Sequence, residues 1–76
     1  MKKNRHIMKH KPYSKFKGVL AEKGLTQKDI AILLNLSPVT INQKINGRLD
    51  FTYGEVEIIC DELNISTEIF RTRKVA

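Results

Sequence analysis

Amide and hydroxyl side chains recur at helical spacing between Ser37 and Arg48, and the chemistry open to them is hydrogen bonding. At 100° per residue, Val39 and Gln43 point to one side of a helix, with Asn42 beside them. An amide can both donate to and accept from the edge of a base, and a valine methyl can contact the methyl of thymine. This face carries no acid that phosphates would repel. Its composition therefore fits a helix that enters a DNA groove.

Other residues offer little chemistry. Only His6 and His10 could act as bases near neutral pH, and both lie in a basic N-terminal stretch. Cys60 has no second cysteine to pair with and falls on an apolar stripe, which favours a small buried hydrophobe. We find no glycine-rich phosphate loop and no Cys/His metal spacing. We therefore expect no catalytic residue, metal, cofactor or small-molecule substrate, and an enzyme is the least favoured hypothesis.

A short helix before the polar face is predicted to begin at Gln27. Thr26 and Asp29 form a T-x-x-D version of the capping box, which satisfies free backbone N–H groups at a helix start. Asn35 ends this helix, because asparagine tolerates a left-handed backbone.

The polar face itself belongs to a second helix. Ser37 is the expected N-cap, and Pro38 stands at the first helical position, where its missing N–H is not needed. This helix runs to about Ile45 and ends at Asn46-Gly47. Two short helices joined by a tight turn indicate a helix-turn-helix.

Further helices are expected on both sides of this motif. Apolar spacing predicts one helix from residue 13 or 14 to 23 and another from 53 to 63, with a last capped turn ending at residue 70. The sequence therefore predicts an all-α fold, a compact bundle of five short helices. We expect its core to consist of Phe16, Leu20, Ile30, Leu34, Leu36, Ile41, Ile45, Val56, Ile59, Leu63 and Ile65.

Charge is distributed unevenly along the 76 residues, whose net charge is +6. Residues 1–48 hold eleven Lys/Arg and two acids, whereas residues 49–70 hold six acids and no Lys/Arg. A molecule with a basic and an acidic half would turn its basic side toward a polyanion. A charged surface that serves only for solubility is the alternative.

Three parts of the chain follow from these patterns. Residues 1–12 form a basic arm that we expect to be disordered, residues 13–70 a DNA-binding domain, and residues 71–76 a basic tail. The arm either contacts DNA or acts as a solubilising tail, and translation starting at Met8 would shorten it. No apolar run approaches a membrane span and no signal-peptide core follows the basic start, so we expect a soluble cytoplasmic protein without membrane contact.

The segment LTQKDIAILLNLSPVTINQKINGR, followed by the spaced residues FT..E...I...LNIS...F, resembles the lambda-repressor-like (Cro and repressor type) helix-turn-helix family. This family places the N-terminal part of the second motif helix in the major groove, usually as two subunits on a two-fold-related operator. The resemblance therefore implies a double-stranded DNA operator as partner and a homodimer on that DNA.

The resemblance also assigns site residues. The positions that match base readers are Pro38, Val39, Asn42 and Gln43. The positions that match phosphate contacts are Gln27, Ser37, Thr40 and Asn46, with Arg48 as a charged addition. Of Ile69 and Phe70 we expect one to close the core and the other to form a dimer contact.

Departures from the family pattern carry their own expectations. Lys44-Ile45 reverses the usual order of an apolar and a polar residue, which predicts a helix rotated slightly against the core. Pro38 cannot make the bidentate amide contact that a glutamine makes. Val39 is either a thymine contact or an ordinary surface valine. Thr40 is either a phosphate contact or bonded back to its own helix.

Two functions are compatible with these features. The first is a sequence-specific DNA-binding transcriptional regulator, most like a small phage or mobile-element repressor of the Cro type. The alternative is an antitoxin-like interaction module that binds a partner protein through the helix at 53–63 and the C-terminal turn.

Overall fold

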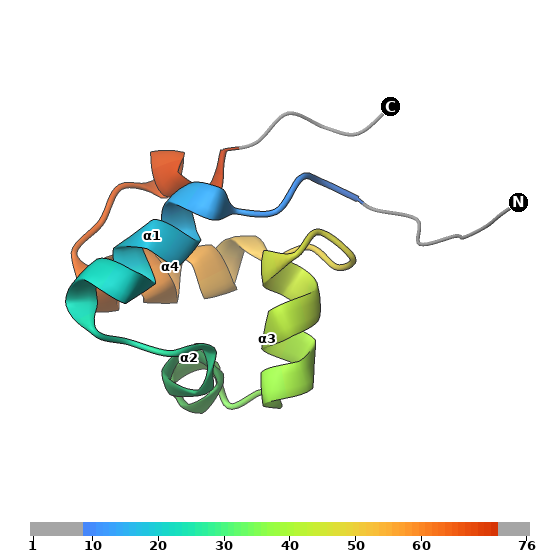
Figure 1. The fold of residues 1–76 in the computed structure, drawn as a ribbon, viewed down its shortest axis with the longest axis horizontal. Coiled ribbons are helices and arrows are strands. Elements are labelled where there is room, and N and C mark those ends of the chain that lie inside the picture. Colours follow the sequence, from blue (N-terminus) through green and yellow to red (C-terminus); the bar gives the residue numbers. More distant parts are fainter. Residues whose placement is uncertain (1–8, 72–76) are drawn as a thin grey trace, which may run out of the picture.

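A computed structural model describes residues 9–71 of the chain. Within that range, four α-helices and a final 3₁₀ turn surround one core, and no strand is present (Figure 1). The elements in chain order are α1 (Ser14–Lys23), α2 (Gln27–Leu34), α3 (Pro38–Ile45), α4 (Tyr53–Leu63) and η1 (Thr67–Phe70). The predicted all-α fold is confirmed.

The fifth element is a 3₁₀ turn instead of an α-helix. Ser66 caps it by accepting a hydrogen bond from the backbone N–H of Glu68 at 3.2 Å. Its backbone bonds span three residues, from the N–H of Ile69 to the carbonyl of Ser66 and from that of Arg71 to Glu68. Four residues are too few for a regular α-helical turn with its own i→i+4 ladder, so the tighter form is adopted.

The helices begin and end where local chemistry requires it. Thr26 and Thr52 each form a complete capping box, with Asp29 and Glu55 respectively. The chain leaves α2 through Asn35, whose φ of 58° lies in the left-handed region. These local signals explain why the predicted helix limits agree with the structure.

Most of the predicted core is buried. Seven predicted residues are buried and pack together: Phe16, Leu20, Ile30, Ile41, Ile45, Ile59 and Leu63. Four others are partly buried at its edge: Leu34, Leu36, Val56 and Ile65. The expected core lacked three apolar residues that the structure buries, Tyr13, Ala31 and Phe51. Tyr13 precedes α1 and Phe51 lies in a connection, so helical periodicity could not reveal them.

An aromatic cluster joins α1, the connection between α3 and α4, and η1. Phe70 packs on Phe16 with ring centroids 4.7 Å apart and meets the ring edges of Tyr13 and Phe51. Ile69 is also half-buried against the core. Ile69 and Phe70 therefore both pack within this chain, and a dimer contact at one of them stays a prediction.

The contacts of the bundle begin before Tyr13. The backbone N–H of Lys9 donates to the carbonyl of Gly47 at 2.6 Å, just beyond the end of α3. His10 is buried, stacks on Tyr13 at 4.2 Å and places its Nε2 2.9 Å from the carbonyl oxygen of Leu49. The end of the predicted arm thus lies against the domain, while residues 1–8 and 72–76, with His6 and Met8, are outside the described range.

A largely buried ion pair joins α3 to the start of α4. Lys44 is only 8% exposed, and its Nζ donates to Oε1 of Glu55 at 2.6 Å while lying 5.6 Å from the Phe51 ring centroid. The reversed Lys44-Ile45 order therefore places an ammonium group where an apolar side chain was expected. Glu55 neutralises its charge, and Ile45 is still fully buried.

This pair makes stability depend on pH. Burial alone would raise the pKa of the Glu55 carboxyl, but hydrogen bonds from Lys44 and the Thr52 backbone, with the Lys44 charge, lower it below its usual 4.5. The contribution of this carboxylate to the free energy of unfolding is complete above its pKa in the unfolded chain. It is lost as the pH falls through its lower pKa in the folded state. We expect the melting temperature of the wild type to fall more steeply from pH 5 toward acid than that of Glu55→Gln, as followed by circular dichroism. Glu57→Gln, an exposed neighbour, should keep the wild-type slope; equal slopes for all three proteins would contradict this prediction.

Candidate nucleic-acid interface

The α2–turn–α3 unit fixes α3 at one side of the molecule (Figure 1). Asn35 turns the chain, and the N–H of Leu36 returns to the carbonyl of Ala31 at 2.9 Å, which makes the joint tight. Ile41 and Ile45 are fully buried and anchor one face of α3 in the core. Because a helix is rigid, the opposite face must point outward.

The predicted base readers lie together on that outer face. Pro38 and Asn42 are exposed, Val39 is 67% exposed, and Gln43 is half-buried at the edge. Val39 offers only methyl groups. The side-chain amides of Asn42 and Gln43 each offer N–H donors and an oxygen acceptor, which complement the acceptor and donor on an adenine edge. The structure thus brings the four predicted positions onto one exposed surface.

One predicted base reader is bonded to one predicted phosphate contact. The amide Nδ2 of Asn42 donates to Oε1 of Gln27 at 3.1 Å, so α3 and the start of α2 are linked across the outer surface. The bond leaves the Gln27 amide N–H₂, the side-chain carbonyl oxygen of Asn42 and the second N–H of its amide available to a ligand. Fifteen residues separate the two in sequence, and no local pattern revealed the contact.

The hydroxyl groups at the start of α3 are mainly structural. Ser37 caps the helix by accepting from the Thr40 N–H at 3.1 Å and donates its own proton to the Thr40 hydroxyl at 2.9 Å. The predicted cap is therefore confirmed, and the Thr40 hydroxyl proton is left for a further acceptor.

At the other end of α3, the side chain of Asn46 already makes two hydrogen bonds within the protein. Its Nδ2 donates to the carbonyl of Asn42 at 2.9 Å, and its Oδ1 accepts from Nζ of Lys17 at 2.8 Å. Arg48 follows with an exposed side chain, and its backbone N–H donates to the backbone carbonyl of Gln43 at 2.9 Å. Lys17 is a functional candidate that sequence analysis missed, since its distance from α3 in the chain hides their contact.

Comparison with known proteins agrees with this geometry. A helix-turn-helix family model matches residues 17–70, most of the chain. The chain belongs to the lambda-repressor-like (XRE-type) helix-turn-helix family. As a member, it is a DNA-binding transcription regulator. Searches among curated proteins and among solved structures gave no match. Along residues 9–71, no helix has the length and apolar character needed to cross a membrane.

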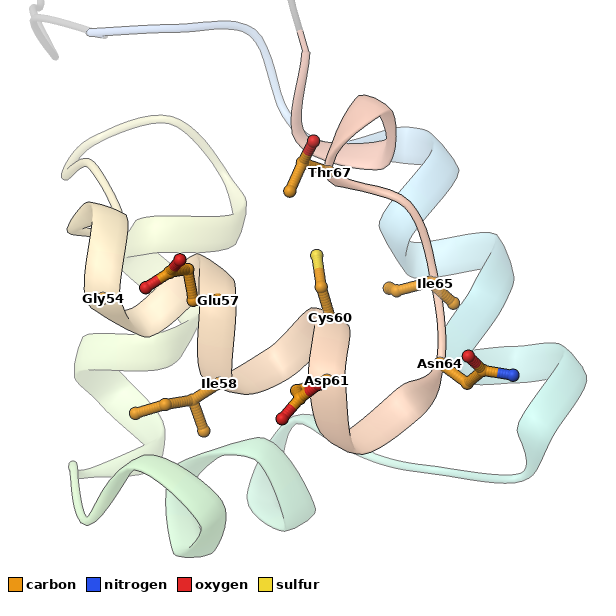
Figure 2. A pocket seen from close by; sticks show the side chains of 8 residues that line it. All are labelled: Gly54, Glu57, Ile58, Cys60, Asp61, Asn64, Ile65 and Thr67. Carbon is orange, nitrogen blue, oxygen red and sulfur yellow. The ribbon is translucent and has the colours of Figure 1, made fainter.

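This helix-turn-helix domain also has an acidic hollow on α4 and the segment after it. Figure 2 shows Glu57, Ile58 and Asp61 along α4, with the Cys60 thiol directed into the same hollow. The lining includes no residue of α2 or α3. Burial raises the pKa of the Cys60 thiol, which agrees with its reading as a small apolar residue. The carboxylates would repel phosphate, so the hollow is unsuited to DNA.

Proposed function

We propose that this regulator is a sequence-specific repressor of the small Cro-like type found in phages and mobile elements, and that it reads the major groove of an operator with α3. The observation that carries the proposal is the outer face of α3: exposed, rich in amides, free of acid and held outward by two fully buried isoleucines. In this family two subunits bind related half-sites. We therefore propose a homodimer on the DNA, acting in the cytoplasm where its operator would be.

The proposed roles follow from the groups that are free. Gln43 reads an adenine edge through its amide, and Val39 contacts a thymine methyl. Asn42 contributes its side-chain carbonyl oxygen and its second N–H, because its other N–H is bonded to Gln27. Pro38 makes only van der Waals contact. Gln27, Thr40 and Arg48 would bind phosphates through the donors that remain to them.

Operator binding tests the proposal directly. Fluorescence anisotropy with duplexes from the region upstream of its own gene, compared with random DNA at moderate salt, should show a clear preference. Absence of any preference would contradict the proposed function. The salt concentration must be stated, because non-specific affinity depends steeply on it.

The Gln43→Ala variant tests the reading role within this function. We expect it to weaken operator binding by about 1–3 kcal/mol, or roughly five- to 150-fold, with little change on random DNA. Discrimination should be lost at one position of each half-site. The control is Thr67→Ala, an exposed change at the acidic hollow, which should bind as the wild type does. An equal loss for Gln43→Ala on operator and random DNA would contradict the base-reading role.

The acidic hollow supports a second candidate function, an antitoxin-like interaction module. Ile58 is 48% exposed between carboxylates, which suits a partner protein with basic and apolar side chains. Stable co-purification with a protein encoded beside this gene would favour that function. The two functions are compatible, because the hollow shares no residue with α2 or α3.

A further inference from the structure

The outward face of α3 carries no charge of its own. Between Ser37 and Gly47 the one charged residue is Lys44, which is buried and neutralised by Glu55. A polyanion such as DNA is nevertheless held largely through cations placed at its phosphates. A cation for this face must therefore come from another element.

Lys17 of α1 lies where such a cation is needed. Its Nζ donates to Oδ1 of Asn46 at 2.8 Å, and helical spacing places Asn46 on the same side of α3 as Val39 and Gln43. The lysine is exposed and its ammonium group has two further N–H donors. The contact thus places a positive charge at the edge of the outer face.

Asn46 is suited to hold Lys17 in this position. Its Nδ2 donates to the carbonyl of Asn42, one turn earlier, so the side-chain amide is fixed against the end of α3. With that donor engaged and its oxygen directed to the ammonium, Asn46 offers a phosphate less than the family position implied. The lysine that it binds has the charge and the free donors instead.

Few groups near this end of α3 would oppose a phosphate. The C-terminal end of a helix normally repels anions through its free carbonyl groups. At α3 two of these carbonyl groups accept backbone N–H groups: Tyr13 donates to the carbonyl of Ile45 at 3.0 Å, and Arg48 donates to that of Gln43 at 2.9 Å. Exposed Lys9 lies next to this end through its bond to Gly47. Residues 9–21 and 30–49 contain no acid, and the exposed carboxylate that follows them, Asp50, lies beside the buried His10 with its Oδ1 3.9 Å from His10 Nε2.

We propose that Lys17 is a contact to the DNA phosphate backbone beside the C-terminal end of α3, and that Asn46 is the positioning residue that holds its ammonium group there. This inference rests on the proposed function and adds α1 to the surface that binds DNA.

The salt dependence of operator affinity tests the lysine. Each phosphate that a cation neutralises contributes about −0.9 to the slope of log K against log salt on duplex DNA. Lys17→Gln should reduce the magnitude of that slope by about one while leaving the preference for operator over a mismatched site unchanged. Lys17→Arg should restore the slope. Lys23→Gln, at the far end of α1, is the matched control and should alter it much less (Figure 1).

A double-mutant cycle tests the positioning role. Asn46→Ala should weaken binding and reduce the slope in the wild type, yet have little further effect in Lys17→Gln, because the two act through one contact. Equal losses in both backgrounds would show that Asn46 binds DNA by itself and would overturn the positioning role. Since Asn46→Ala also removes a helix-end bond, its thermal unfolding is measured; if it is unfolded, the Gln and Arg variants of Lys17 decide the proposal.

The outcomes separate this inference from the function on which it rests. A wild-type protein without preference for any operator overturns both. A wild-type protein that prefers its operator, combined with an unchanged slope for Lys17→Gln, overturns the lysine contact alone.

Discussion

Glu55→Ala is expected to lower the free energy of unfolding by about 3 kcal/mol, because it leaves a buried ammonium group without its partner. The carboxylate accepts from Lys44 at 2.6 Å and from the Thr52 backbone N–H at 2.9 Å, so one substitution removes both the ion pair and half of a capping box. Lys44 would then face the Phe51 ring at 8% exposure. Urea unfolding followed by circular dichroism measures the loss.

Two further variants separate the unpaired charge from a general effect of mutating α4. Glu57→Ala, exposed on the same helix, should change the free energy of unfolding by less than about 0.5 kcal/mol. The double variant Lys44→Met with Glu55→Gln should recover much of the loss, because it removes both charges of the pair and retains a residue that completes the capping box. If Glu55→Ala cost no more than Glu57→Ala, the pair would have no structural role.

The second large effect is expected from Phe16→Ala, at about 3–5 kcal/mol. Phe16 is fully buried, and its ring contacts those of Phe70 at 4.7 Å and Phe51 at 6.3 Å between centroids. Truncation would leave a cavity where α1, the α3–α4 connection and η1 meet. A domain of this size is stabilised by only about 5–10 kcal/mol, so the variant should have lost much of its stability.

Thermal melts and NMR spectra would show this loss. The control is Ile32→Ala, which shortens an apolar side chain that is 71% exposed and should melt close to the wild type. Phe16→Leu should give an intermediate stability, because it refills part of the cavity. A melting temperature of Phe16→Ala within a few degrees of the wild type would contradict the central position given to the aromatic cluster.

The Lys44–Glu55 ion pair connects stability to the proposed function. The Lys44–Glu55 pair attaches the buried side of α3 to the start of α4, whereas Gln43 and Asn42 lie outward on the same short helix. A rotation of α3 would move each outward side chain relative to the groove. The buried pair is therefore part of what orients the DNA-contacting face in our proposal.

Local chemistry is what made the sequence informative about this protein. Caps such as Thr26 and Ser37 and left-handed ends such as Asn35 act within a few residues, so their effect on helix limits can be read directly. Helical spacing likewise placed Ile41 and Ile45 in the core and Val39 and Gln43 outside. The helix-turn-helix and its outward positions follow from such signals alone.

Only the tertiary structure decided which polar side chains already bind another residue of the protein. Asn42 binds Gln27 across 15 residues, Asn46 binds Lys17 across 29, and Lys44 is buried against Glu55. His10, predicted to lie in an arm before the first helix, is buried against the domain. Contacts between distant segments depend on how whole helices pack, and a single sequence holds no periodic trace of them. That is why the sequence determined where the proposed site lies, whereas the packing of the helices decided which of its side chains are already hydrogen-bonded to other residues.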